Sequence, residues 1–518
     1  MIPSHPVEIE LKLALPPDRV AMFLKRMARR RSVPVQQDIV TRYFDTPDFA
    51  LSSQGIALRV RKAGRRWLQT LKTEGERQGG LSRRAEYEMT IPGGQPDWSR
   101  FPAAAQALVA DALRAQLIPL FETRFTRTAW LVGGRGGARV EVALDVGEVR
   151  ALKGIGAPNG EVNAGKRSQP ICEIELELKA GKPDALFALA LGWAGQLGCL
   201  PLDVSKAERG VRLVRGEVAA PVKSAPVDLR GDMRVEEGLA AIVQACLTQF
   251  QANLPGVLAS DDVEYVHQAR VALRRLRAAL RLVRRACVLP HALRDGLRKL
   301  SAALGPARDW DVLWCETLPA IAPYYADEDA WQCGLNVLEA RRADARAAMR
   351  AAIRREHPGA WLLAFQRWLM QQGWRDVPES RRRVQLSPLN KWARRKLQKG
   401  HRRIARAPAR MRPAECHALR IAVKRQRYAV EFFQALFAGC RQTGYRATLQ
   451  DMQESLGRIN DRSVATRLLT EAGAELGPMR GFALDWLAFR QPGEKKSGIA
   501  KLLKNVMKWT PCWQVAAG

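Results

Sequence analysis

The sequence lacks the cysteine patterns that cross-link small domains or bind zinc. Its nine cysteines are scattered through 518 residues, and no two of them form a C-x-x-C pair. This spacing argues against a zinc site and against a disulfide framework. It predicts a reducing compartment, the cytoplasm.

A long hydrophobic run is also missing. The longest apolar stretch, residues 185–202, contains Gln196, Pro201 and three glycines. Interruptions of this kind are typical of a buried helix, and we therefore expect no membrane span.

Acidic side chains are scarce relative to basic ones. The chain has 84 Lys and Arg but only 52 Asp and Glu, which gives a formal net charge of +32. The hydrophobic fraction of 47% is ordinary for a globular protein and excludes wholesale disorder. A surface this basic repels itself unless it meets a polyanion, such as nucleic acid, an anionic membrane or polyphosphate.

The excess charge is concentrated in the second half of the chain. Residues 216–232 read GEVAAPVKSAPVDLRGD, a proline-containing segment without periodicity that is typical of a linker. Before it, residues 1–220 have 33 basic and 24 acidic side chains, a net +9. Residues 221–518 have 51 and 28, a net +23. We therefore expect two domains with different chemistry.

The first half alternates between apolar and charged residues. Residues 7–13, 56–61, 86–91 and 171–178 place apolar side chains at every second position or nearly so. Period two is the signature of a β-strand. Turn residues separate the runs, so an antiparallel sheet or barrel with interspersed helices is predicted.

The charges on these strands are sorted by sign. Three strands carry them on one face: Glu8, Glu10 and Lys12; Arg59 and Arg61; Glu173, Glu175 and Glu177. A solvent-exposed outer face would explain the charges of any single strand. Because the charges are sorted by sign from strand to strand, a lumen shared by the strands is favoured. Carboxylates suit Mg²⁺ or Mn²⁺, whereas Arg and Lys suit phosphate oxygens. Together they indicate phosphoryl-transfer chemistry.

The motif Glu8-x-Glu10-x-Lys12 resembles the ExExK signature of CYTH domains, the triphosphate tunnel metalloenzymes. The ordered match continues through Tyr43-Phe44-Asp45-Thr46-Pro47, Leu58-Arg59-Val60-Arg61, Leu71-Lys72, Arg84-Ala85-Glu86-Tyr87-Glu88, Arg124, Asp145, the Glu173 strand and Ser205-Lys206-Ala207. The resemblance implies an α+β domain over residues 1–215, built on an eight-stranded antiparallel β-barrel with a polar tunnel.

The resemblance also implies roles for individual residues. Divalent metal, Mg²⁺ or Mn²⁺, would be held by Glu8, Glu10, Glu173 and Glu175, with support from Asp145. Triphosphate would be held by Lys12, Arg59, Arg61, Lys72, Arg124 and Lys206. Glu86 and Glu88 match an acidic pair without a defined role. Known CYTH reactions include hydrolysis of tripolyphosphate, of thiamine triphosphate and of mRNA 5′ ends, and adenylate cyclisation. No recognition surface for an organic group is evident in the sequence.

The second half is helical by pattern and contains an internal repeat. Residues 267–277 match residues 417–427, and residues 304–309 match residues 456–461. On a helix, His267, Arg270, Arg274 and Arg277 share one face because they are spaced 3, 4 and 3 apart. The second copy presents His417, Arg420, Lys424 and Arg427 in the same way. A solvated face is one interpretation, but duplication at the same spacing favours an anion site.

This pattern resembles the CHAD domain, a conserved-histidine helical domain, over residues 233–515. The second copy departs from the first at Lys424 and Asn460, where the first has Arg274 and Arg308. The resemblance implies an all-α domain of two pseudo-symmetric four-helix bundles, whose basic helices face a groove that binds long-chain inorganic polyphosphate. The eight residues of the two faces would be the binding residues.

The two resemblances predict a metal-dependent inorganic triphosphatase fused to a polyphosphate-binding module, with association to polyphosphate granules. Specific nucleic-acid binding is not expected, because single-strand binders interleave stacking aromatics with their cations and the stripe from Arg270 to Arg284 has none. Two alternatives stay open: a non-catalytic polyphosphate-binding protein, and a nucleoside triphosphatase or class IV adenylate cyclase.

Overall fold

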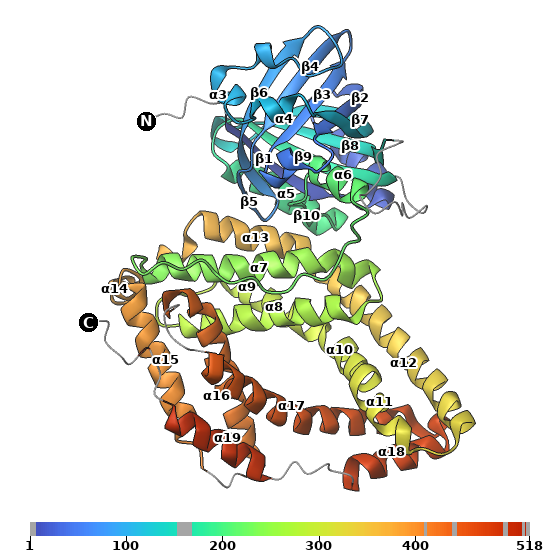
Figure 1. Ribbon diagram of the computed structural model, residues 1–518, viewed down its shortest axis with the longest axis vertical. Helices are drawn as coiled ribbons and strands as arrows, with labels where there is room; N and C mark the ends of the chain where they lie inside the picture. Colours follow the sequence, from blue (N-terminus) through green and yellow to red (C-terminus); the bar gives the residue numbers. More distant parts are fainter. Residues whose placement is uncertain are drawn as a thin grey trace. The chain divides into compact units, whose positions relative to one another are not determined.

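A computed structural model describes residues 7–152, 168–408, 412–437, 443–489, 496–509 and 513 (Figure 1). The chain divides into two compact units. The first comprises Met1–Ala220 together with His357–Arg367, and the second comprises Pro221–Glu356 together with Trp368–Gly518. Each unit is described by itself below.

The first unit is an antiparallel β-barrel of eight strands. In order around the barrel they are β1 (Val7–Ala14), β9 (Ser168–Ala180), β8 (Arg139–Ala151), β7 (Ile118–Gly133), β2 (Val35–Asp45), β3 (Ala57–Ala63), β4 (Arg66–Lys72) and β6 (Leu81–Ile91). Pairing of β1 with β6 closes the ring. Two short strands, β5 (Glu76–Gln78) and β10 (Leu200–Pro201), pair beside it. The predicted eight-stranded antiparallel barrel is confirmed.

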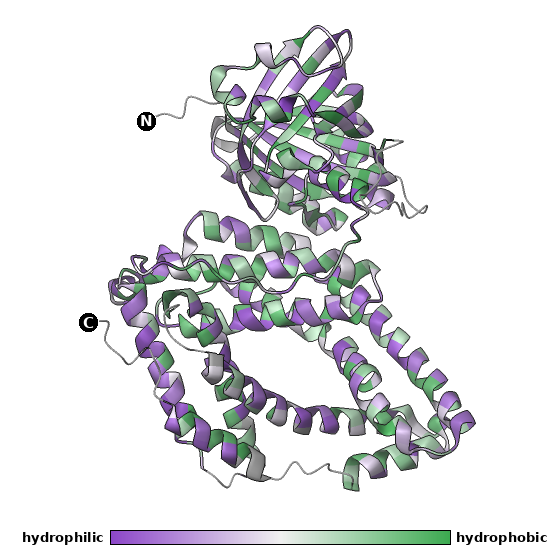
Figure 2. Cartoon of the chain, viewed as in Figure 1, coloured by the Kyte–Doolittle hydropathy of each residue, from purple (hydrophilic) through white to green (hydrophobic). Residues whose placement is uncertain are grey.

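The barrel has its apolar residues on the outside. Leu11 and Leu13 of β1, like Ile174 and Leu176 of β9, are fully buried, and the charged residues between them point the other way because successive side chains on a strand alternate. Figure 2 shows this alternation along the strands. The sorted charges therefore face a lumen and not the solvent.

Helices cover the apolar outer face. They are α1 (Val20–Met27), α2 (Ala50–Ser53), α3 (Ala103–Gln106), α4 (Asp111–Arg114), α5 (Asp184–Leu197) and α6 (Lys206–Val214). Phe23 of α1 makes edge-to-face contacts with Trp130 of β7 and Trp193 of α5, with ring centroids 5.9 and 5.4 Å apart. Residues 185–197 of the long apolar stretch thus belong to a covering helix, and the stretch continues into β10. In the described ranges, no helix has both the length and the apolar character needed to cross a membrane.

The second unit is helical. Its elements are α7 (Val235–Ala259), α8 (Val263–Leu282), α9 (His291–Ala303), α10 (Gly305–Val312), α11 (Leu318–Ile321), α12 (Glu328–Arg355), α14 (Glu379–Gln385), α15 (Leu389–Ala405), α16 (Pro413–Phe432), α17 (Thr443–Ala472), α18 (Pro478–Phe489) and α19 (Lys496–Lys508). Helix α13 (Pro358–Met370) contains the residues at which the chain divides between the units. The expected grouping into two four-helix bundles stays a prediction.

The two sequence repeats occupy matching helices, but their second blocks differ. In the first copy the chain breaks between α9 and α10, and Pro306 lies in the first turn of α10. Proline has no N–H group and clashes with the preceding turn, so it starts a helix more readily than it continues one. The second copy has Arg458 at this position, and α17 runs through it without a break.

The segment between the units has no regular structure, yet part of it is fixed to the helical unit. The backbone N–H of Val222 donates to Asn253 Oδ1 at 2.9 Å, and Asn253 Nδ2 donates back to the Val222 carbonyl at 2.8 Å. Val227 and Leu229 are buried. The composition predicts a linker, but the hydrogen bonds of Val222 attach this segment to α7, and two of its later side chains are buried.

Candidate functional site

The barrel lumen is a cavity of about 310 Å³ lined mainly by charged side chains. Its acidic lining residues are Glu8, Glu10, Glu86, Glu88, Glu141, Glu175 and Glu177. Its basic lining residues are Lys12, Arg59, Arg61, Lys72, Arg84, Arg127, Lys179 and Lys206. Such a concentration of both signs in one enclosed space offers sites for a metal cation and for a phosphate chain together.

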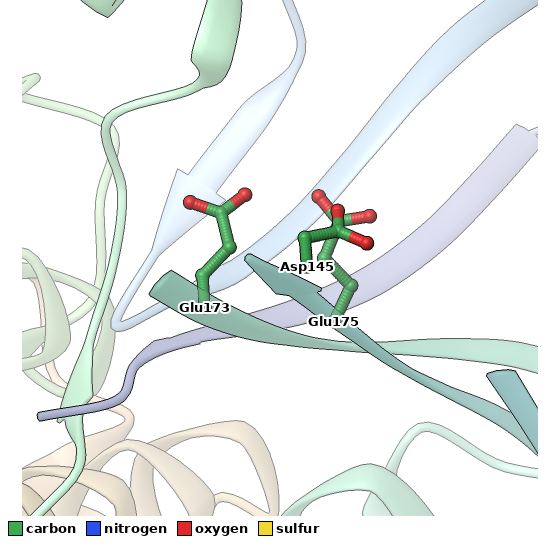
Figure 3. Close-up of side chains that lie close together, drawn as sticks. All are labelled: Asp145, Glu173 and Glu175. Atoms are coloured by element: carbon green, nitrogen blue, oxygen red, sulfur yellow. The ribbon is translucent and has the colours of Figure 1, made fainter. Parts of the chain in front are cut away.

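Three acids form a cluster on β8 and β9, of which Asp145 and Glu173 are buried and Glu175 is half-buried (Figure 3). Asp145, Glu173 and Glu175 each offer a carboxylate oxygen within 4.8 Å of the others. Asp145 lies directly across from Glu173 in the β8–β9 pairing, and cross-strand partners share a face. Three close carboxylates repel one another, so the cluster needs a cation.

Lys206 supplies that cation. Its Nζ lies 2.6 Å from Asp145 Oδ2 and 2.9 Å from Glu175 Oε1, and it also pairs with Glu173. Lys206 is the first residue of α6, whose N-cap, Ser205, accepts a hydrogen bond from the Glu208 N–H. Burial alone would raise the pKa of Glu175, but Lys206, Lys12 and Arg127 hold it well below its usual range.

Glu8 and Glu10 lie on β1 and share Arg84 as a partner. Lys72 Nζ is 2.7 Å from Glu8, and Arg84 donates to Glu8 at 3.2 Å and to Glu10 at 2.6 Å. Neither glutamate belongs to the three-carboxylate cluster found among the described residues. The structure therefore brings together Glu173, Glu175 and Asp145, and it connects the other two predicted metal ligands to this cluster through Lys12, which lies 2.9 Å from Glu10 and 3.4 Å from Glu175.

Arg84 is a lumen residue to which sequence reasoning assigned no role. It occupies β6 two residues before Glu86, and its register partner across β1 is Glu8. The alternation of Arg84, Glu86 and Glu88 on a strand was the available signal, because it places all three on one face.

Arg124 does not line the lumen cavity, although it was predicted to hold triphosphate. Its side chain is 55% exposed and pairs with Glu122 at 2.6 Å. Arg127, three residues further along β7, faces the lumen instead and donates to Asp145 at 2.8 and 2.7 Å and also to Glu175. Three residues is an odd step, so the two arginines point to opposite faces of the strand.

The remaining cations line the opposite wall of the lumen. Arg59 lies 3.4 Å from Glu86, whereas Arg61 has no carboxylate within 4.0 Å in the described part of the chain. The charge of Arg59 and burial lower the pKa of Arg61 to about 10. An arginine without a carboxylate partner is available for an anionic ligand.

Tyr43 of β2 also lines this wall, and sequence reasoning gave it no role. Its ring stacks on Phe121 at 4.6 Å. Burial by itself would raise the pKa of the phenol, but Arg59, Lys206 and Arg61 lower it overall. A phenol polarised in this way is a strong hydrogen-bond donor toward a phosphate oxygen.

The carboxylate cluster suits a divalent metal. Mg²⁺ and Mn²⁺ prefer oxygen ligands, and Asp145, Glu173 and Glu175 offer three at one point. The ammonium group of Lys206 already occupies the space between them. This arrangement indicates that the position stabilises positive charge, so the residues fit a metal.

The helical unit contains the predicted basic faces on α8 and α16. His267, Arg270 and Arg274 are half-buried on α8, and Arg277 is exposed. Arg420, Lys424 and Arg427 are half-buried on α16. His417 lies in α16, but its side chain is outside the described residues. The apolar positions beside the α8 face, Leu273 and Leu276 among them, are buried in the core.

Cations of the two faces lie close enough to affect each other. Burial, together with Arg420 and Arg274, lowers the pKa of Lys424 to about 8. Burial and Arg274 likewise lower the pKa of Arg270 to about 10. Buried side-chain nitrogens of His267, Arg270, Arg274 and Arg420 have no hydrogen-bond partner among the residues that the structure describes. Buried cations that lower each other's pKa and retain unpaired donors are typical of an anion site.

Each of the two units contains a match to a known protein family. The CYTH domain family matches residues 7–211, and the CHAD domain family matches residues 241–470. An inorganic triphosphatase of Haemophilus influenzae is 32% identical over 212 residues, which are 40% of this chain and 54% of that protein. The chain thus spans about half the length of this curated relative.

Two solved structures are also similar. The CHAD domain from the plant Ricinus communis has 32% sequence identity and a TM-score of 0.48, and the match covers 55% of this chain and 96% of that one. A Hippeastrum protein, described as an adenylyl cyclase with a dominant triphosphatase activity, has 19% identity and a TM-score of 0.28, with 41% and 97% covered. The family matches identify the two parts of the chain: residues 7–211 are a CYTH domain and residues 241–470 are a CHAD domain.

Proposed function

We propose that the chain is a metal-dependent inorganic triphosphatase that hydrolyses tripolyphosphate to pyrophosphate and phosphate. The observation that carries the proposal is the carboxylate cluster of Asp145, Glu173 and Glu175, whose member Glu175 lines a lumen that also presents arginine and lysine. The resemblance to the Haemophilus triphosphatase supports the same activity.

In this proposal the three carboxylates hold Mg²⁺ or Mn²⁺, and Glu8 and Glu10 are further candidate ligands. When bound, such a metal neutralises phosphate charge and makes water a better nucleophile. Arg59, Arg61, Lys72, Arg127 and Lys206 bind and orient the phosphate oxygens. Because charge spreads over those oxygens in the transition state, cations fixed in advance lower the barrier without covalent catalysis.

The lumen favours an inorganic substrate over one with an organic group. Its few uncharged lining residues are small or singly placed: Thr41, Tyr43, Ala57, Phe125, Ala143, Ser205 and Ala207. None of them forms an apolar subsite large enough for a base or a thiamine ring. Tripolyphosphate needs only cations and a metal.

The triphosphatase proposal is tested by phosphate release from tripolyphosphate with Mg²⁺ or Mn²⁺, with ATP and thiamine triphosphate as comparison substrates. Glu173→Gln should abolish release, because an amide is a poorer metal ligand. Glu148→Gln, a charge-matched change at a partly exposed position on the same sheet, should leave release unchanged. Absence of release from the folded wild type, or faster turnover of ATP, would contradict the proposal.

We further propose that the helical unit binds long-chain polyphosphate along the faces of α8 and α16, and that this binding associates the protein with polyphosphate granules in the cytoplasm. A linear polyanion matches cations placed along one helix face at successive turns. The unpaired donors of Arg270 and Arg420 support this assignment.

Polyphosphate affinity should be measured at two salt concentrations. Arg270→Ala with Arg420→Ala should weaken binding about tenfold or more, since charge-assisted contacts are the strong ones. Arg355→Ala with Arg402→Ala removes the same charge from exposed positions and should have little effect. Equal losses in the two double variants would mean that net charge alone binds the polymer.

A further inference from the structure

A second cavity, of about 340 Å³, lies within the helical unit. It is formed by the C-terminal end of α8, by α14 and by the start of α15. Leu282, Val283 and Ala286 line it on one side, and Val384 and Trp392 on the other. Val283, Ala286 and Trp392 are buried, so the interior of the cavity is hydrocarbon and indole.

Cations surround this apolar interior. Arg285, Arg383, Arg395 and Lys396 complete the lining. Within the described residues, Arg285, Arg395 and Lys396 have no carboxylate within 4.0 Å, and Arg383 pairs only with exposed Glu379 at 3.5 Å. Burial, Arg285 and other nearby cations lower the pKa of Lys396. Clustered like charges without counter-ions are unfavourable unless an anion joins them.

The apolar walls distinguish this cavity from the polyphosphate faces and from the barrel lumen. A polyphosphate chain has no apolar part, and therefore gains nothing from burial against Leu282 or Val384. A nucleobase would need hydrogen-bond partners, but the only hydroxyl in the lining, that of Ser387, already donates to the Val384 carbonyl at 2.7 Å. Lys396 Nζ lies over the Trp392 ring at 4.8 Å, where a base would otherwise stack.

We infer that this cavity binds a small organic anion, a compound that carries a phosphate, sulfonate or carboxylate group on a hydrocarbon or aromatic body. The body fills the space between α8 and α14, and the anionic group meets Arg285 and Lys396 at the rim. The volume lies in the range of ordinary small-ligand sites. The inference does not depend on the activity proposed for the barrel.

The test uses the full chain and 8-anilinonaphthalene-1-sulfonate, an aromatic sulfonate whose fluorescence rises in apolar surroundings. Arg285→Gln with Lys396→Gln should weaken its binding about tenfold or more, because two charge-assisted contacts are lost. Val384→Trp, which fills the cavity, should weaken it to a similar degree. Lys391→Gln with Arg402→Gln removes two exposed charges from the same helix, α15, and should change the affinity less than twofold.

Competition separates this site from general anion binding. Naphthyl phosphate and decanoate should displace the probe, whereas tripolyphosphate at equal ionic strength should not. Circular dichroism would establish that Val384→Trp is folded. The variant that combines Arg285→Gln with Lys396→Gln tests the site without a core substitution. The inference would be overturned if the control pair lost as much affinity for the probe as the test variants, or if the test variants lost none. It would also be overturned if tripolyphosphate displaced the probe as effectively as naphthyl phosphate.

Discussion

Lys206→Met should destabilise the barrel strongly, since it removes the cation that Asp145, Glu173 and Glu175 share. The side chains of Lys206, Asp145 and Glu173 are only 8%, 0% and 1% exposed, so solvent screens their interaction little. Removal of one partner from a buried ion pair costs ~3–5 kcal/mol. For a unit of about 200 residues, each kcal/mol lowers the melting temperature by about 2–4 °C, which predicts a fall of about 6–20 °C.

The stability lost in Lys206→Met should depend on pH. The pKa of Glu175 is depressed in the folded state, so its ionised form contributes stability above the unfolded pKa of about 4.3, and that contribution is lost as pH falls through the folded value. Without Lys206 the pKa of Glu175 is lowered less. The difference in melting temperature between wild type and variant should therefore be full near neutral pH and should narrow below about pH 4.

Calorimetry of the full chain, with and without Mn²⁺, measures these effects. Mn²⁺ should stabilise Lys206→Met more than wild type, because the metal replaces the missing charge. Lys12→Met is the matched control: Lys12 lies 3.4 Å from Glu175 and 2.9 Å from Glu10 but leaves Asp145 and Glu173 paired, so the response to Mn²⁺ should be smaller. The reasoning is refuted if Lys206→Met melts within about 2 °C of wild type at neutral pH.

Three further predictions concern the other features. Polyphosphate affinity should fall between about pH 7 and 9 because the pKa of Lys424, about 8, sets the charge of that face; in Lys424→Arg, binding titrations at several pH values should show this fall disappear. Arg127→Gln should reduce tripolyphosphate turnover about a hundredfold, whereas Arg124→Gln should change it less than twofold in the same kinetic assay; similar effects would contradict the assignment of faces. Asn253→Ala should lower the stability of the helical unit by about 1–3 kcal/mol in urea unfolding, because the N–H and carbonyl of Val222 lose their partner. An unchanged unfolding midpoint would mean that Asn253 does not hold the segment that contains Val222.

The sequence predicted the barrel because alternation is a local property that each strand shows by itself. The strands containing Glu8, Arg59 and Glu173 all appear where period two predicted them. The lumen could be inferred from the sorted signs of charge, but the partners of each charge depend on register. Arg84 lies opposite Glu8, and Arg127 opposite Asp145, and neither pairing can be derived from one strand alone.

The choice between Arg124 and Arg127 illustrates the same limit. Both occur in the long strand β7, in the run Phe121–Trp130, where polar and apolar residues do not alternate regularly. Only the pairing with β8 decides which of them faces inward. In the helical unit, the spacing of Arg270 and Arg274 predicted a shared face, whereas the second cavity depends on the packing of α8 against α14 and α15, which lie far from α8 in the sequence.

The inverted arrangement of the barrel, with leucine outside and glutamate inside, changes what burial means for this protein. In an ordinary domain a residue withheld from solvent tolerates exchange among hydrocarbons and rejects charge. Here buried positions on the two faces of the barrel wall have opposite requirements: Asp145 and Lys206 would tolerate only another ion, whereas Leu11, which is equally withheld from solvent, requires a hydrocarbon. A substitution scan would thus find two buried layers with opposite preferences, one on each face of the barrel wall, and the exposure of a residue would not by itself predict which substitutions its position accepts.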